Sequence, residues 1–289
     1  MESLTRRRFL QGTAGLAAAA VLADAAILEP NFPRLVRVEV PLLRLPEAFD
    51  GFTIVQLSDF HYDPYLSIHA IRAAVEMTNQ LQPDVVALTG DFVTLPLLPD
   101  FFERRRSAAL DAEPCGGLLS ALNAREGRFC VLGNHDVSTS RRLITEILNS
   151  FDLHVLDNRS VVLERSGARL WFAGMDDRLD GDPDIDLALK GIPAGDPVVM
   201  LVHEPDVADN VKQYPVDLQL SGHSHGGQVS PLGIGPIYLP AFARKYPRGL
   251  YDFGSLVLYT NIGLGTIRIP VRINCPPEVT FLTLRSRKV

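Results

Sequence analysis

Four motifs built from Asp, Asn, Gly and His, together with one isolated His, each stand at the carboxyl end of a short apolar run. Runs of four to six residues rich in Val, Ile and Leu are typical of buried strands. His, Asp and Asn at strand ends supply the nitrogen and oxygen ligands of a divalent metal pair, and a metal pair indicates hydrolytic chemistry. The motifs are Asp59-Phe60-His61, Gly90-Asp91, Gly133-Asn134-His135-Asp136, His203 and Gly222-His223-Ser224-His225.

The spacing of the apolar runs predicts an α/β fold. Residues 52–57, 84–88 and 128–132 are expected to be buried strands, and helical periodicity predicts helices over 67–81 and 138–149. Later in the chain the strands follow one another more closely and helical segments are fewer. This change predicts two packed sheets flanked by helices. The later strands are expected at residues 154–156, 161–164, 170–173, 198–202, 218–221, 256–260 and 279–284.

Residues 1–25 have the features of an export signal. The basic segment Arg6-Arg7-Arg8-Phe9-Leu10 precedes a mildly apolar stretch, and Ala23-Asp24-Ala25 provides a cleavage site of the small-x-small type. The paired arginines resemble a bacterial twin-arginine signal, which indicates the twin-arginine export machinery as a partner and the periplasm or cell envelope as the destination. An uncleaved anchor is the alternative, although the apolar stretch is shorter than the roughly 20 residues that a spanning helix needs.

The rest of the chain divides into a short connecting segment and one main domain. Residues 26–50 are expected to form a linker and then an edge strand, because apolar and charged residues alternate over 35–40. Residues 51–289 are expected to form the main domain, since a 46% hydrophobic composition is enough for a large core. Three widely spaced cysteines do not form a disulfide framework.

The charge distribution disfavours nucleic acid as a partner. The formal net charge is -6, and after residue 25 the densest basic cluster, Arg104-Arg105-Arg106, directly follows Glu103. A phosphate backbone is normally met by a basic face. A general nuclease is therefore disfavoured.

The first two motifs supply carboxylates at strand ends. Asp59 and His61 are two residues apart, so an extended backbone places both side chains on one side, where they can bind one metal. Asp91 follows Gly90, which allows a sharp turn, and a carboxylate can bridge two cations whereas an imidazole cannot. Asp91 is therefore the candidate bridging ligand. A surface hydrogen-bonded pair and a helix cap are the alternative interpretations.

The third motif combines a metal ligand with a group for the substrate. Asn134 offers a neutral carbonyl oxygen to a metal, and the adjacent His135 is placed to reach the substrate, where it could protonate a leaving alkoxide. Asp136 or Asp63 could orient His135 through a hydrogen bond. The alternative for His135 is that it is a third metal ligand.

The last two histidine motifs complete the ligand set. His203 follows five apolar residues, a position where a histidine by itself is more often structural. His223 and His225 are two residues apart and flanked by glycines, so a compact loop could turn both imidazoles onto neighbouring metals. The glycines also let backbone N–H groups approach an anion.

In their order along the chain these motifs resemble the calcineurin-like metallophosphoesterase superfamily, whose pattern is D-x-H, G-D, G-N-H-D/E, H and G-H-x-H. All five blocks occur between Asp59 and His225. Other segments resemble the exported, twin-arginine-dependent bacterial branch (YkuE/YaeI-like phosphoesterases), which extends the resemblance over nearly the whole chain after residue 25. These are Gly226-Gly227-Gln228, Pro236-Ile237-Tyr238-Leu239-Pro240, Arg248-Gly249-Leu250-Tyr251, Gly263-Leu264-Gly265 and Arg272-Ile273-Asn274-Cys275-Pro276-Pro277-Glu278.

The resemblance implies a four-layer α/β/β/α sandwich of two mixed sheets flanked by helices, the metallo-dependent phosphatase fold. It implies hydrolysis of phosphate mono- or diesters by a metal-bridging hydroxide, with His135 as the catalytic histidine and two divalent metals as cofactors. Mixed nitrogen and oxygen ligands favour Mn, Fe or Zn over Ca or Mg. The implied ligands are Asp59, His61 and His225 for the first metal and Asn134, His203 and His223 for the second, with Asp91 shared.

Two other functions are compatible with these motifs. One is a pyrophosphatase or phosphodiesterase that acts on a lipid-linked nucleotide or cell-wall polymer, with Phe101, Phe102 and the apolar segment 231–242 as a lipid-facing surface. The other is a metal-binding scaffold without catalysis, which is disfavoured because every ligand block is intact. Peripheral association with the membrane or cell wall would accompany the first alternative.

Overall fold

The computed structural model describes residues 6–95 and 107–287, and Phe101, Phe102 and the arginines 104–106 lie outside them. The helices are α1 (Arg6–Ala23), α2 (Ser67–Leu81), α4 (Ala112–Leu119), α5 (Asn134–Ser150), α6 (Ile185–Ala188) and α7 (Ala208–Val211). The strands are β1 (Arg34–Leu42), β2 (Thr53–Leu57), β3 (Val85–Thr89), β4 (Gly127–Val131), β5 (His154–Val155), β6 (Arg159–Arg165), β7 (Ala168–Gly174), β8 (Val198–Leu201), β9 (Leu218–Ser221), β10 (Gly249–Asp252), β11 (Val257–Thr260) and β12 (Glu278–Ser286).

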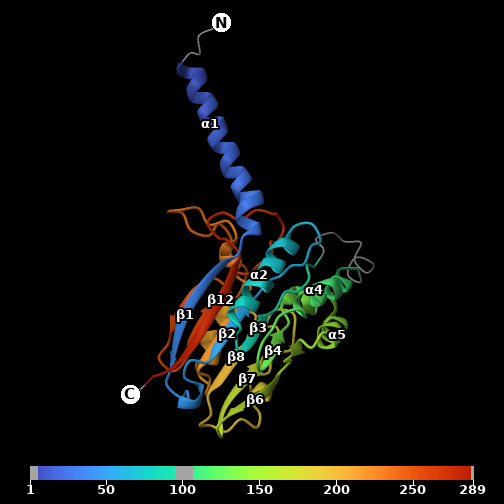
Figure 1. Ribbon diagram of the computed structural model, residues 1–289, viewed down its shortest axis with the longest axis vertical. Coiled ribbons are helices and arrows are strands. Elements are labelled where there is room, and N and C mark those ends of the chain that lie inside the picture. The colour runs from blue at the N-terminus through green and yellow to red at the C-terminus, as the bar shows by residue number, and fades with distance from the viewer. Residues whose placement is uncertain (1–5, 96–106, 288–289) are drawn as a thin grey trace.

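The strands form two six-stranded mixed sheets (Figure 1). The strand order is β1-β12-β2-β3-β4-β5 in the first sheet and β10-β11-β9-β8-β7-β6 in the second. Neighbouring strands are parallel except for β12 with β2, β10 with β11 and β6 with β7. The parallel strands β2, β3, β4, β8 and β9 are almost entirely buried, as expected for strands covered on both faces.

Alternate residues of each strand enter different cores. In β3, Val85 and Ala87 pack between the two sheets, whereas Val86 and Leu88 pack against α2, α4 and α5 on the outer face. A third core lies on the outer face of the second sheet, beneath α6 and α7. The layers are therefore helices, sheet, sheet and helices, which confirms the predicted four-layer α/β/β/α sandwich.

One helix begins earlier than the sequence indicates. The periodicity predicts a helix from residue 138, but α5 starts at Asn134 after Gly133. The Asp136 carboxylate accepts a hydrogen bond from the Gly133 N–H at 3.0 Å, which caps the helix start. Asn134 and His135 consequently lie in the first turn of α5.

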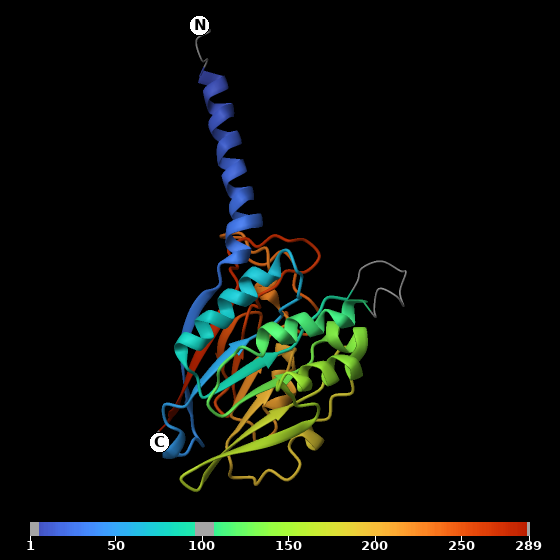
Figure 2. The same ribbon diagram turned by 45° about the vertical axis from the view of Figure 1, so that its right-hand side comes forward.

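The N-terminal segment extends from one end of the sandwich, where α1 rises beside the loops coloured orange and red (Figures 1 and 2). Residues 24–31, expected to be signal end and linker, form helical turns that pack on the domain. The Ala25 carbonyl accepts the Arg272 N–H at 2.9 Å, and the Glu29 carboxylate accepts the Asn274 N–H at 3.1 Å. Strand β1 follows at the edge of the first sheet. Within the described ranges, no helix is both long and apolar enough to span a membrane.

Candidate metal centre

The predicted ligands meet where the carboxyl ends of β2, β3, β4, β8 and β9 face one another. Five of them adopt left-handed backbone conformations, which non-glycine residues rarely do and which are frequent at functional sites. The left-handed turns aim consecutive polar side chains at one point directly after each strand ends. The five φ values are 50° for Asp59, 40° for His61, 57° for Asp91, 65° for His223 and 50° for His225.

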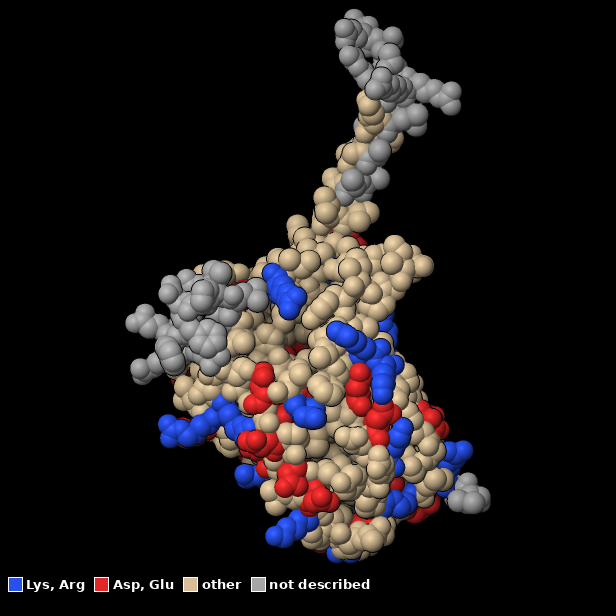
Figure 3. Space-filling view, turned by 180° about the vertical axis from the view of Figure 1, so that it is seen from behind, with Lys and Arg blue, Asp and Glu red and all other residues tan. Residues whose placement is uncertain are grey.

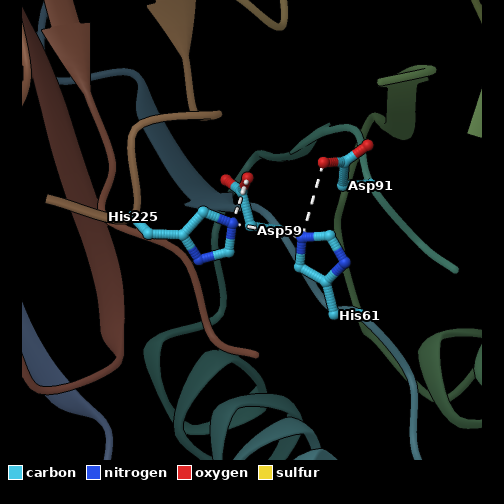
Figure 4. Close-up of side chains that lie close together, drawn as sticks. All are labelled: Asp59, His61, Asp91 and His225. Atoms are coloured by element: carbon cyan, nitrogen blue, oxygen red, sulfur yellow. Dashed lines mark hydrogen bonds and ion pairs between the residues drawn. The ribbon is translucent and has the colours of Figure 1, made fainter. Parts of the chain in front are cut away.

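The first donor cluster comprises Asp59, His61, Asp91 and His225, all of which are buried (Figure 4). The Nε2 atoms of His61 and His225 lie 3.1 Å apart. His61 Nε2 is 3.4 Å from Asp91 Oδ2, and His225 Nε2 is 3.3 Å from Asp59 Oδ1. Two imidazole nitrogens and two carboxylates therefore converge on one point.

The second donor cluster comprises Asp91, His203 and His223. His203 Nε2 lies 3.1 Å from His223 Nδ1 and 3.3 Å from Asp91 Oδ2. The same Asp91 oxygen thus faces a histidine of each cluster. Asn134 Oδ1 is buried and has no hydrogen-bond partner among the described residues, which leaves it available as a further ligand.

The chemistry of these residues fits divalent metal ions. Burial lowers the pKa of His61 and of His223 to about 3, so both imidazoles are neutral and present lone pairs. Burial would raise the pKa of Asp91, but His203 and His135 outweigh it and hold that pKa well below its usual range. Burial also lowers the pKa of His225, so the Nε2 atoms of His61 and His225 belong to neutral rings 3.1 Å apart, and a metal ion between them would bind both lone pairs.

Backbone groups orient two of the ligating rings. His203 Nδ1 contacts the Thr89 carbonyl at 2.6 Å, which turns Nε2 toward Asp91. His223 Nε2 contacts the Ala241 carbonyl at 3.0 Å, which leaves Nδ1 for the metal. Such hydrogen bonds fix the tautomer of a metal-binding histidine.

Gly133 is required by the close packing around Asp91. A Cβ at this position would overlap Asp91 Oδ1 and the His203 ring. The β4–α5 connection therefore passes directly against the shared carboxylate. Glycine serves at this position to allow the close approach of the backbone.

His135 lies beside the first cluster, with its ring centroid 4.8 Å from that of His61. The Leu95 N–H donates a hydrogen bond to His135 Nδ1 at 2.8 Å. Nδ1 therefore holds the lone pair, and in the neutral ring Nε2 carries the proton. His135 also lines the central cavity, where it can donate that proton in a hydrogen bond.

The two carboxylates predicted to orient His135 have other partners. Asp136 accepts hydrogen bonds from the Gly133 and Val93 N–H groups, and its burial, followed by the influence of Asp91, raises its pKa to about 8. Asp63 accepts from the N–H groups of Tyr65 and Leu66 before α2. Among the described residues neither carboxylate forms a hydrogen bond with His135, and their hydrogen bonds instead support the starts of α5 and α2.

Sequence reasoning missed one buried positioning residue. Arg272 is fully buried and donates hydrogen bonds to the carbonyls of Ile262, Gly263, Gly265 and Cys275. Leu264 and Gly265, in the loop that Arg272 holds, donate backbone hydrogen bonds to the carbonyls of Ser58 and Asp59. A lone arginine between apolar residues was the available signal, but sequence alone does not reveal its burial.

A cavity of about 560 Å³ opens above both clusters. Asp91, Asn134, His135, His223 and His225 line its floor. Its walls are mostly apolar and include Ile237, Tyr238, Pro240, Ile267 and Ile269.

Comparison with known proteins agrees with this geometry. The family model for calcineurin-like phosphoesterases matches residues 52–227, which include every candidate ligand. The chain belongs to this family. It is 34% identical to the uncharacterized metallophosphoesterase YkuE of Bacillus subtilis, over 99% of both chains, and 32% identical to the phosphodiesterase YaeI of Escherichia coli, over 97% and 99% of the two chains.

A solved structure shares the fold. The chain superimposes on the sulfate thiohydrolase SoxB of Thermus thermophilus with a TM-score of 0.50 and 12% identity, covering 83% of this chain and 57% of that one. Family membership makes the protein a metal-dependent phosphoric ester hydrolase. A non-catalytic scaffold is therefore not supported.

Proposed function

We propose that this phosphoesterase uses two metal ions, acts outside the cytoplasm and prefers phosphodiesters. The observation that carries the proposal is the Asp91 carboxylate, one oxygen of which lies 3.3–3.4 Å from a histidine of each cluster. A bound metal pair lowers the pKa of water and polarises the phosphoryl group. The mixed histidine, carboxylate and amide donors favour Mn, Fe or Zn.

The residues of the chain around the metals position the substrate. The neutral His135 ring presents its Nε2–H group to the cavity. There it donates a hydrogen bond to a phosphoryl or leaving-group oxygen. The backbone N–H of His135 donates a hydrogen bond to Asp91 Oδ1 at 3.0 Å. This bond keeps the other oxygen, Oδ2, directed at the two clusters. The apolar cavity walls exclude water and accept the organic group of an ester.

The wide apolar cavity supports a preference for diesters. A diester carries a second organic group that can lie along the cavity wall, whereas a monoester exposes a second negative charge there. Arg268 is the only Lys or Arg among the described residues that line the cavity. The similarity to YaeI, which is named a phosphodiesterase, supports the same preference.

The proposed site of action depends on residues 1–25 as a twin-arginine signal. The paired arginines Arg6 and Arg7, followed by Phe9-Leu10, support this route. Replacing both arginines by lysine should retain the protein in the cytoplasm, as measured by cell fractionation. The mass of the exported protein would show whether cleavage follows Ala25. Unchanged export of the double variant would refute the route.

A second candidate is a pyrophosphatase or phosphodiesterase that acts on a lipid-linked or cell-wall substrate. The exposure of the apolar segment 231–242 favours it. The UDP-2,3-diacylglucosamine pyrophosphatase LpxG of Chlamydia muridarum is 27% identical over 88% of this chain and 90% of its own length.

The direct test compares aryl phosphate mono- and diesters with the protein reconstituted separately with Mn, Zn, Fe and Mg. We expect diester turnover to exceed monoester turnover and to require about two metal ions per chain. Equal or greater monoester turnover would refute the diester preference. Full activity with one metal ion per chain would refute the two-metal assignment.

A further inference from the structure

Two loops, residues 229–243 and 263–271, form an exposed apolar surface beside the cavity. We define the apolar rim as Leu232, Ile234, Ile237, Tyr238 and Ile269. Leu232 is 85% exposed, Ile234 77% and Ile237 67%. Ile237, Tyr238 and Ile269 also line the cavity, so the rim and the cavity wall form one continuous apolar surface. Large contiguous apolar patches mark a binding surface for a protein or a membrane.

Hydrogen bonds hold the two rim loops in place. The Gln228 side chain donates to the Ile269 carbonyl at 2.8 Å and accepts the Ile267 N–H at 2.8 Å. The Ile237 N–H donates to the Val229 carbonyl at 3.0 Å. The rim is therefore an ordered structure attached to the loop that carries His225.

The charged side chains within the rim loops and directly after the first of them are basic, although the chain is acidic overall. Residues 229–243 contain no charged side chain, and 263–271 contain only Arg268. The Arg268 guanidinium lies 5.1 Å from the centre of the Tyr238 ring. Arg244 and Lys245 follow the first loop, where Lys245 forms an ion pair with Asp209, and the whole chain has a net charge of -6. An apolar surface flanked by cations matches a membrane that contains anionic lipids.

The N-terminal helix leaves the molecule at the same end. Figures 1 and 2 place the base of α1 beside the rim loops, and Ile27 and Leu28 at that base are 61% and 51% exposed. Figure 3 shows a largely uncharged surface between α1 and a hollow on this face, with charged residues gathered farther from α1. An N-terminus held at a membrane would present the rim and the cavity mouth to that membrane.

We infer that the apolar rim inserts into a lipid bilayer containing anionic lipids, and that the enzyme hydrolyses a membrane phospholipid-type phosphodiester. The inference rests on the proposed phosphodiesterase function and names its substrate class. Hydrolysis forms one bond from the water oxygen to phosphorus and breaks one ester P–O bond. The departing oxygen takes up a proton that the attacking water releases, and the acyl chains remain along the rim.

The first test measures insertion without using activity. Ile234→Trp and the control Leu43→Trp are made in the full chain and mixed with vesicles of phosphatidylethanolamine and phosphatidylglycerol whose acyl chains are brominated. Leu43 is 49% exposed and follows β1 at the end away from α1 (Figure 1). Bromine should quench the tryptophan introduced at position 234 but not the one at position 43, after subtraction of native Trp171. Absent or equal quenching would overturn the inference.

The second test separates the lipid substrate from the chemistry. Leu232→Ser/Ile234→Ser should lower kcat/KM on vesicle phosphatidylglycerol roughly tenfold or more, because two inserted side chains are lost. Its turnover of a soluble aryl phosphodiester and that of Leu43→Ser should stay within about twofold of wild type, since these residues lie outside the catalytic machinery. An equal loss on both substrates would overturn the inference, as would rim-dependent dimers without vesicles. If the wild type hydrolyses neither substrate, the proposed function fails, while quenching still reports on insertion.

Discussion

Strand β3 has an aspartate just beyond each end, and the two have opposite environments. Asp84 precedes the strand, and its carboxylate accepts hydrogen bonds from the N–H and hydroxyl of Thr53, both at 2.8 Å, and from Arg125 and Arg165. Asp91 follows the strand in a left-handed conformation and faces His61 and His203. Among the described residues, Asp84 is surrounded by hydrogen-bond donors alone, whereas one oxygen of Asp91 faces two histidine nitrogens that are candidate metal ligands.

The difference separates groups that stabilise the fold from groups that perform chemistry. The hydrogen bonds and cations around Asp84 outweigh its burial and lower its pKa. Around Asp91 the described residues instead include buried histidines, a second carboxylate and an Asn134 oxygen that has no hydrogen-bond partner among them, an arrangement that divalent cations would complete. Removing Asp84 should therefore weaken the fold, and removing Asp91 should abolish activity.

Asp91→Asn should have the largest effect. Loss of the shared carboxylate removes several kcal/mol of metal and transition-state stabilisation, so kcat/KM should fall by roughly 10⁴-fold. Metal analysis should give at most one ion per chain, while circular dichroism stays that of the folded protein. Retention of two metals together with wild-type turnover would refute the bridging role.

His135→Ala should lower kcat by about 10²–10³-fold, the range for loss of one hydrogen-bond donor to the charge that develops in the transition state. Its metal content should stay that of the wild type, because His203, His223 and the Asp91 cluster are intact. Loss of both metals from this variant would show that His135 is a metal ligand. It would refute the role of His135 as a hydrogen-bond donor to the substrate.

Gly133→Ala tests the close packing around Asp91. A clash with Asp91 and His203 should cost about 1–3 kcal/mol, or roughly 10- to 100-fold in metal affinity measured by competition with a chelator. Gly195→Ala is the matched control, because a Cβ there meets no atom within 4 Å. Equal metal affinity of the two variants would show that the contact is not tight.

Asp84→Asn should leave the activity of the folded enzyme unchanged and lower the free energy of unfolding by about 1–2 kcal/mol, since charged hydrogen bonds are lost. The lowered pKa of Asp84 means that its stabilisation is present above the unfolded value, about 3.9, and disappears as the pH falls through the folded value. The stability difference between wild type and variant should therefore shrink below about pH 4. A constant difference over that range would contradict this assignment.

Much of the fold and of the site could be predicted, because both follow from the types of residues and their spacing along the chain. The apolar runs locate β2, β3 and β4, and the periodicity of 67–81 gives the bounds of α2. Because a carboxylate can bridge two cations, the sequence alone also predicts Asp91 as the bridging ligand. The structure places that residue between both donor clusters.

The rest depends on backbone groups, which residue types do not encode. The partner of His135 is the Leu95 N–H, and carbonyls of Thr89 and Ala241 orient the ligating histidines. The position of Asp136 after His135 predicts an orienting carboxylate. Because α5 starts at Asn134, the Asp136 carboxylate instead accepts the Gly133 N–H and caps the helix. Such contacts follow from tertiary geometry.

The most direct test of the central claim is anomalous diffraction from crystals of the protein reconstituted with Mn or Zn. We predict two anomalous peaks about 3.5–4 Å apart, with Asp91 between them, Asp59, His61 and His225 around one, and Asn134, His203 and His223 around the other. A single peak, or two peaks that Asp91 does not bridge, would contradict the account.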